Sequence, residues 1–573
     1  MSDSIDVITL SVVWTRLVEI CEEMGAALRK TAFSPAIREA EDCGVGLFDR
    51  RGRLLAQGVF TPGQVGSMPF ALQHALDAYP AETLRPGDGI VLNDPYMGNG
   101  HLPDIFCFAP VYSDDELVGY AGSCAHHMDV GGAAPGSQAT VGIFDMHQEG
   151  IRITPVRAFV GGDPVREVLE LVTANVRKPD DTAGDLRAQM TTCLIGARRL
   201  VELYDEYGEA VIEGCMDELI ARTETGAREA VSAIPDGRYE FEDYLDDWGP
   251  DTDPVRIAVA VDVSGDEITV DFTGTGPAVR AALNCPYNFT YAYSLFAVKA
   301  LTDATLPENE GGRRPLTVIA PEGCFLNPIP PAPTGARATV AIRIVDAIMG
   351  ALSQALPERA VAAPSHFVNT TFGGVSDTGE PFVYYELLIG GVGGRAHSDG
   401  VDGLVSCFNT SNIPVEIHEA TSPVLVERLE LLEDSGGPGL HRGGVGIRKV
   451  LRVLAGPVRL TNLADRQVYP AWGLFDGEPG AIGSVTLSRN GHTEVLHSKT
   501  TRDVAAGDIL DYRVAGAGGW GRPFARDPDA VLDDVIDGLV SVAAAEERYG
   551  VVVDRAAGEV DLTKTAERRK ESK

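Results

Sequence analysis

The sequence predicts an α+β protein, a large mixed fold in which helices and strands fill different stretches of the chain. Apolar residues recur at helical spacing near the N-terminus and again over residues 165–232. From about residue 237 the chain changes to short strand-forming runs separated by glycine-rich loops. A helical pattern then returns near the C-terminus. These observations predict an N-terminal domain at 1–240, a β-rich domain at 241–525 and a helical tail at 526–573.

The N-terminal part is expected to begin with a helix over residues 10–28, where apolar side chains recur every three or four positions. Thr9 precedes this pattern and is the predicted N-cap. Two short strands at 45–48 and 53–56 follow, joined by a tight turn. A further helix is expected at 69–78, after a glycine-rich loop.

A second β-hairpin is the most informative element of this part. Its strands are predicted at 105–109 and 117–121, and the acidic run 113–116 has the composition of a turn. A turn centred between Asp114 and Asp115 would set Asp104 opposite Ala125 across the two strands.

The C-terminal half reads mainly as strands. Strands are expected at 256–261 and 267–272, helices at 291–302 and 339–356, and a β-rich stretch with glycine-rich loops at 423–523. The tail has a periodic apolar face, which consists of Val531, Val535, Leu539, Val540 and Val542.

Charge and composition exclude several classes of function. The chain has 573 residues, with 48 basic and 83 acidic side chains and a formal charge of −35. This acidity argues against nucleic acid and anionic membranes as partners, because both require clustered Lys and Arg. No run of about 18 apolar residues occurs, and the first residues have no basic segment followed by an apolar one, so we expect no secretory leader. The nine cysteines include no Cys-x-x-Cys pair, so we expect reduced thiols and a cytoplasmic location.

The hairpin predicts a metal site. The loop before its first strand contains His101 and Asp104, and its second strand ends at His126 and His127. The antiparallel pairing should bring both ends together, and alternation along the strand allows only one of the two adjacent histidines to join the cluster. Two imidazoles and one carboxylate suit Zn²⁺, Mn²⁺ or Fe²⁺ with open coordination positions. The alternative is a polar loop in which the His and Asp side chains bond one another and the backbone.

Other motifs are weaker. The run 391–396 matches a loose dinucleotide-binding pattern, but no helical pattern follows it. The run 435–444 has the composition of an anion-binding loop that uses Arg442, although a tight structural loop is the favoured interpretation. No Gly-Lys pair occurs, so a P-loop is absent, and no Gly-x-Ser-x-Gly motif occurs either.

A series of motifs, in order along nearly the whole chain, resembles the hydantoinase B / 5-oxoprolinase family. This family includes the B-type subunits of ATP-dependent hydantoinases, caprolactamase and acetone- or acetophenone-type carboxylases. The matching segments are Ser34-Pro35-Ala36-Ile37-Arg38-Glu39 with Asp42, Asn93-Asp94-Pro95, Gly100-His101-Leu102-Pro103-Asp104, Ala125-His126-His127-Met128-Asp129-Val130-Gly131-Gly132, Glu149-Gly150-Ile151-Arg152, Gly184-Asp185-Leu186-Arg187-Ala188-Gln189, Leu440-His441-Arg442-Gly443-Gly444 and Ala517-Gly518-Gly519-Trp520-Gly521.

The resemblance implies one divalent metal ion, zinc or manganese, held by Asp42, His101, Asp104 and His126. Asp42 is included among the ligands only because of the resemblance. The family's usual Asp-Phe-Ser is here Asp42-Cys43-Gly44, and its Gly-Gly-Thr-His is Gly98-Asn99-Gly100-His101. Both departures lie beside the implied ligands, so they bear on the substrate pocket more than on metal binding.

The resemblance also implies a division of chemistry between two polypeptides. An A-type subunit with an actin-like ATPase fold phosphorylates the carbonyl oxygen of a small cyclic amide, and the B-type subunit completes hydrolysis. The ATP would therefore be bound by the partner. Beside the ligands, His127 or Asp129 is expected to orient or deprotonate the attacking water, with structural support as the alternative. The competing functions are a B-type subunit of a ketone carboxylase and a non-catalytic scaffold for an ATPase.

Overall fold

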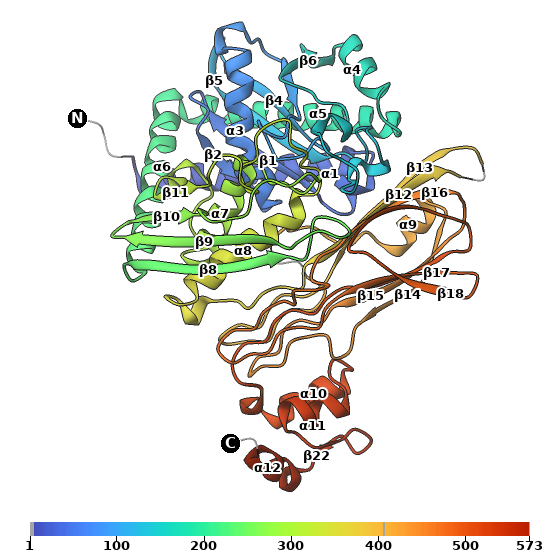
Figure 1. The fold of residues 1–573 in the computed structure, drawn as a ribbon. Helices are drawn as coiled ribbons and strands as arrows, with labels where there is room; N and C mark the ends of the chain where they lie inside the picture. Colours follow the sequence, from blue (N-terminus) through green and yellow to red (C-terminus); the bar gives the residue numbers. More distant parts are fainter. Residues whose placement is uncertain (1–4, 377, 405–406, 572–573) are drawn as a thin grey trace.

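The computed structural model describes residues 5–376, 378–404 and 407–571. Figure 1 shows three regions: a helix-covered sheet from the N-terminal part, a pair of strand layers that extends from it, and a small helical tail at the far end. The predicted α+β class is confirmed. In the described residues, no helix has both the length and the apolar character needed to cross a bilayer.

The N-terminal region is built on a seven-stranded antiparallel sheet with the order β2-β1-β5-β4-β3-β6-β7. Its helices cover both faces: α1 and α5 pack on one face, and α3 packs on the other. The strands are β1 Cys43–Asp49, β2 Leu54–Gln57, β3 Gly89–Leu92, β4 Asp104–Ser113, β5 Glu116–His126, β6 Val156–Val160 and β7 Asp163–Pro164. The helices are α1 Val7–Thr31, α2 Pro35–Arg38, α3 Pro62–Ala78, α4 Arg166–Thr173, α5 Pro179–Tyr207 and α6 Glu209–Ser232.

Two helix starts differ from the predictions. Helix α1 is capped by Asp6, whose carboxylate accepts hydrogen bonds from the N–H groups of Ile8 and Thr9, so Thr9 is already inside the helix. Helix α3 begins at Pro62, and Pro69 lies within it. Proline is favoured in the first turn of a helix, and two prolines in one stretch offered two possible starts.

The middle of the chain forms a four-stranded sheet with the order β11-β10-β9-β8. Only the β10–β11 pair is parallel. Its strands are β8 Gly237–Leu245, β9 Val255–Ser264, β10 Glu267–Asp271 and β11 Leu316–Ile319. Two helices pack beneath it, α7 (Tyr287–Leu301) and α8 (Arg337–Leu352), and each begins a few residues earlier than predicted. Every residue of α8 except Ala338 is buried.

The C-terminal half forms two antiparallel sheets that share one apolar core. One has the order β13-β12-β16-β19 and the other β14-β15-β20-β17-β18. The strands are β12 Phe367–Val375, β13 Pro381–Ile389, β14 Val424–Leu431, β15 Ile447–Val453, β16 Val458–Leu463, β17 Ser484–Arg489, β18 His492–Leu496, β19 Lys499–Val504 and β20 Ile509–Arg513. A short helix, α9 (Val415–Thr421), lies beside β13 and β14.

The tail is a separate small cluster of elements. They are α10 Pro528–Ile536, α11 Val542–Tyr549, β21 Val553–Asp554, β22 Glu559–Val560 and α12 Leu562–Glu571. Arg526 attaches the tail through two hydrogen bonds to Asp399, of 2.6 and 2.7 Å, and one to Asp534. Arg442 also bonds Asp534, so the glycine run 435–444 is a structural loop, as the favoured interpretation held.

The three-part division at 240 and 525 remains a prediction. The first boundary falls within β8, which pairs with β9 along its whole length. A division after α6, at the end of Ser232, would leave every strand pair intact.

Candidate metal centre

The predicted hairpin is present, with its register shifted by one residue. Asp104 faces His126 across β4 and β5, whereas the sequence placed it opposite Ala125. The cause is a bulge opposite Val111 and Tyr112, where Val118 is an extra, unpaired residue of β5 near the turn. The shift sets Asp104 and His126 directly opposite each other.

The loop that precedes β4 brings His101 to the same end of the hairpin. Asn93 holds this loop: its Nδ2 donates to the carbonyl oxygens of Leu102 (2.7 Å) and Ile151 (3.0 Å). Gly100 has a φ of 80°, a conformation that favours glycine, directly before His101.

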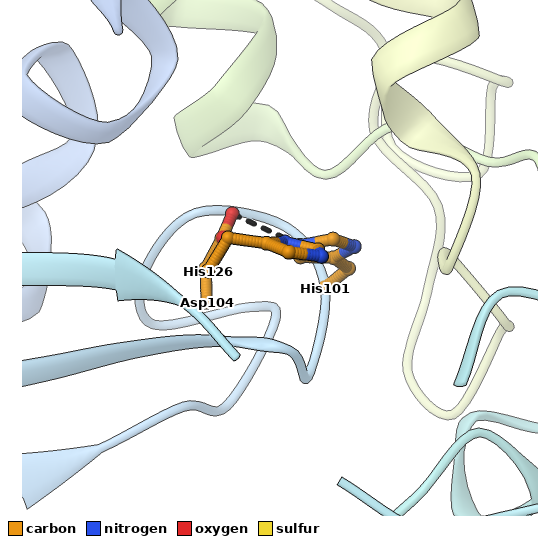
Figure 2. Close-up of side chains that lie close together, drawn as sticks. All are labelled: His101, Asp104 and His126. Atoms are coloured by element: carbon orange, nitrogen blue, oxygen red, sulfur yellow. Dashed lines mark hydrogen bonds and ion pairs between the residues drawn. The ribbon is translucent and has the colours of Figure 1, made fainter. Parts of the chain in front are cut away.

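Three side chains converge there, as Figure 2 shows. His101 Nε2 lies 3.0 Å from Asp104 Oδ2, and His126 Nδ1 lies 3.2 Å from Asp104 Oδ1. One potential ligand atom from each residue lies within 4.8 Å of the others, and all three side chains are buried. The predicted convergence of these residues is therefore present in the fold.

Asp42 lies beside this trio, directly before β1. Its Oδ2 is 3.9 Å from His126 Nδ1, and its backbone carbonyl accepts a hydrogen bond from the N–H of His126. Gln64, from α3, donates to Asp42 Oδ1 at 2.9 Å and lies 3.5 Å from Asp104 Oδ1. This amide links the two carboxylates.

The donor atoms fit a divalent metal. The Nδ1 of His101 lies 3.1 Å from the carbonyl oxygen of Gly335, which can only accept, so Nδ1 is protonated and Nε2 keeps its lone pair. That buried Nε2 makes no hydrogen bond of acceptable geometry with the described residues, although it faces Asp104. A histidine whose other nitrogen donates to a backbone carbonyl is typical of metal ligands. The set of two imidazoles and one or two carboxylates suits zinc or manganese.

Burial and neighbouring charges shift the ionisation of the site. Burial lowers the pKa of His101 to about 4, and the nearby Arg337 adds to the effect, so this imidazole is neutral at pH 7. Burial raises the pKa of Asp42 to about 6, with Asp104 adding repulsion. Burial would also raise the pKa of Asp104, but His101 and Arg337 together hold it well below its usual range.

Sequence reasoning missed Arg337, which contacts the same carboxylate. Its Nη2 donates to Asp104 Oδ2, and its Nε donates to the carbonyl oxygen of Asn99 at 2.9 Å. Arg337 occupies the first turn of α8, upstream of the predicted helix start at 339. Charged residues in a mainly apolar helical stretch were the available signal, because buried cations are paired.

The site borders a small cavity of about 30 Å³. Its lining includes Asp42, His101, His126 and Arg337, further polar side chains, and aromatic and aliphatic side chains. The main apolar lining residues are Phe289, Tyr293, Phe367, Leu387, Phe408 and Leu463. The ring of Tyr385 stacks on His126 with 4.8 Å between the ring centres. Such a space admits water or a very small ligand.

The two expected catalytic residues lie away from this cavity. His127 Nε2 lies 3.0 Å from Gln189 Oε1, and Gln189 in turn donates to the carbonyl oxygen of Ile105. Asp129 accepts hydrogen bonds from the N–H groups of Gly131 and Gly136 and from the backbone and guanidinium of Arg177. Neither lines the cavity, and both hold neighbouring segments in place. These contacts favour the structural alternative for both residues.

The family model for hydantoinase B/oxoprolinase matches residues 6–523. The chain belongs to this family. The resemblance drawn from the sequence motifs is thereby confirmed, and the match covers all of the metal-site residues.

Individual relatives agree with this assignment. The B-type component of a D-/L-hydantoinase from Pseudomonas sp. (strain NS671) is 35% identical over 99% of this chain and 98% of its own length. The crystal structure of the ATP-dependent caprolactamase from Pseudomonas jessenii superposes with a TM-score of 0.89 at 29% identity, and covers 99% of this chain and 100% of that one.

A nucleotide-free acetone carboxylase structure has a TM-score of 0.91 at 20% identity, and covers 99% of this chain and 82% of that one. At this identity, the similarity shows a shared fold.

Proposed function

We propose that this hydantoinase B chain is the metal-bearing B (beta) subunit of an ATP-dependent cyclic amide hydrolase of the hydantoinase, oxoprolinase or lactamase type. The supporting observation is the convergence of His101, Asp104 and His126 at the end of the hairpin. The hydantoinase and caprolactamase relatives make a hydantoin or a lactam the substrate class to test first.

The proposed ligands are His101, Asp104 and His126, with Asp42 as the fourth. A zinc or manganese ion held there would supply Lewis acidity and would lower the pKa of water toward about 7. Gln64 and Asn99 would keep the two carboxylates in position, because each donates its amide to one of them. His127 and Asp129 would support the ligands from outside the cavity.

The ATP-dependent step is assigned to a partner subunit. Phosphorylation of the amide oxygen creates a leaving group that an unstrained amide lacks, and this chain has no P-loop sequence of its own. We propose an A-type ATPase with an actin-like fold as that partner, and hydrolysis of the activated ring at the metal site of this chain.

Metal analysis of the co-purified complex tests the ligand assignment. His101→Ala should lose nearly all bound zinc or manganese, and ATP-dependent ring opening with it, because a buried ligand with a free lone pair is removed. His147→Ala is the matched control, since His147 is exposed and contacts only Asp145 among the described hydrogen bonds. Full metal occupancy in His101→Ala would contradict the assignment.

The same preparation separates the two enzyme functions. Supplied with ATP and a hydantoin or lactam, the complex should release the open-chain product. Formation of a carboxylated product from a ketone and bicarbonate would instead identify a carboxylase.

A further inference from the structure

Arg337 is the one cationic side chain among the described residues that line the metal-site cavity. It is 6% exposed and lies over the ring of Phe289, 4.5 Å from the ring centre. Its Nε and Nη2 are bonded to Asn99 and Asp104, while no hydrogen bond is found for its Nη1 among the described residues. One face of a buried guanidinium therefore retains hydrogen-bonding capacity beside the cavity.

A second arginine on the same helix shows the contrast. Arg343 is fully buried and uses Nε, Nη1 and Nη2 in hydrogen bonds to Asp465 and Asp243. Each of the three guanidinium nitrogens of Arg343 therefore has a carboxylate partner, as expected for a structural ion pair. Arg337 is satisfied only on its Nε and Nη2 side.

The charges of the site give the reason for the difference. Asp42 and Asp104 contribute two negative charges, Arg337 contributes one positive charge, and ligating imidazoles are neutral. With the divalent ion proposed above, the two carboxylates and Arg337 would together leave the site with one net positive charge, although Arg337 keeps its bond to Asp104. A net charge in a buried cavity is costly, so an anion that accepts a hydrogen bond from Arg337 Nη1 would balance the complete site.

We propose that Arg337 binds an anionic oxygen of the reacting molecule beside the metal, so that this site selects a carboxylate, a phosphate or an oxyanion over a neutral group. The inference rests on the proposed function and specifies its ligand class. Donors aimed at developing negative charge in a water-excluded site are strong stabilisers of transition states. Charge-assisted hydrogen bonds from arginine suit a two-oxygen anion.

Binding of formate and of formamide to the manganese-loaded protein tests the proposal by calorimetry. The two probes have nearly the same size and differ in charge, and three heavy atoms match the small cavity. The wild type should bind formate and should not bind formamide. Arg337→Met should weaken formate binding by about tenfold or more, because the positive charge is lost. Manganese binding should persist, because methionine keeps much of the length of the side chain.

Arg337→Lys should keep part of the formate affinity, since the charge remains and the fork of donors is lost. Arg166→Met is the matched control, because Arg166 is exposed on α4 and pairs only with Glu170 among the described salt bridges. If the methionine variant fails to fold by thermal melting, Arg337→Gln takes its place. Equal formate affinity in the wild type and the neutral variants, or equal binding of formate and formamide, would overturn the inference.

The outcome separates this inference from the proposed function. A wild type that holds neither zinc nor manganese would contradict the metal centre, and formate binding is then measured on the metal-free protein. Lack of dependence on Arg337 in that measurement also overturns the anion site.

Discussion

Glu149 is a buried carboxyl group that supports the metal site from outside it. Its Oε1 accepts hydrogen bonds from the N–H groups of Thr334 (2.9 Å) and Gly335 (2.6 Å), and the carbonyl of Gly335 orients His101. Its Oε2 is buried and makes no hydrogen bond with the described residues. Glu149 therefore fixes the dipeptide that in turn fixes a ligand.

Burial raises the pKa of Glu149 to about 8, from 4.5 in the unfolded chain. The folded protein keeps the proton at neutral pH and the unfolded chain releases it. The stability contributed by this group is therefore complete below about pH 4.5 and is lost as the pH rises through about 8. Glu149→Gln cannot ionise, so its melting temperature relative to wild type should rise between about pH 6 and pH 9. A difference between the two melting temperatures that is constant over this range would contradict the raised pKa.

The sequence predicted those residues of the candidate site that strand pairing within one hairpin brings together. His101, Asp104 and His126 belong to one hairpin, so turn position and strand alternation were enough to bring them together. Arg337 is 233 residues from Asp104 in the sequence, and no local pattern connects them. Asp42 required the family resemblance, because its position depends on the pairing of β1 with β5.

At the scale of elements, glycine-rich segments of the C-terminal half pack backbone against backbone. Gly518 donates to the carbonyl oxygen of Ala363 and accepts from the N–H of Gly394. A Cβ on Gly518 would lie 2.0 Å from the carbonyl oxygen of Trp472. The sequence showed the excess of glycine and its β-rich surroundings, but the contacts join segments distant in the chain.

Gly518→Ala should lower the free energy of unfolding by about 1–3 kcal/mol, because neighbouring backbone must move to admit one methyl group. Gly276→Ala is the control, since its Cβ would meet nothing closer than 3.6 Å. Its cost should stay within about 0.5 kcal/mol. Urea unfolding of both variants measures the difference, and equal midpoints would show that these segments separate easily.

Element boundaries were less predictable than element types. The hairpin strands, both small strands near residue 50 and the helical stretch 165–232 are all present. The errors arose where a single residue determines a boundary or a register. The bulge at Val111 and Tyr112 shifted the register between β4 and β5 by one residue, and α3 begins at Pro62 and not at Pro69. Nothing in the local pattern distinguishes these alternatives.

Across the whole molecule, helix α8 connects the metal centre to the C-terminal sheets. Arg337 in its first turn contacts Asp104, while Arg343 and Asp346 further along contact residues beyond β16. Asp243 of β8 bonds both Arg343 and Arg466, so the middle sheet joins the same buried network. The network links three regions that are far apart in the sequence.

Arg343→Met should therefore lower the stability of the whole chain. Removing this cation leaves Asp465 and Asp243 buried with fewer positive partners, which costs about 3–5 kcal/mol for a buried ion pair. Urea unfolding should show a single transition at a lower midpoint, because α8 is shared by the regions that would otherwise separate. Arg222→Met removes an exposed pair with Glu218 and should change stability by less than about 1 kcal/mol. Adding Asp465→Asn to Arg343→Met should restore part of the lost stability, since it removes a buried negative charge that has lost its partner. A double variant no more stable than the single one would show that the network does not act through charge.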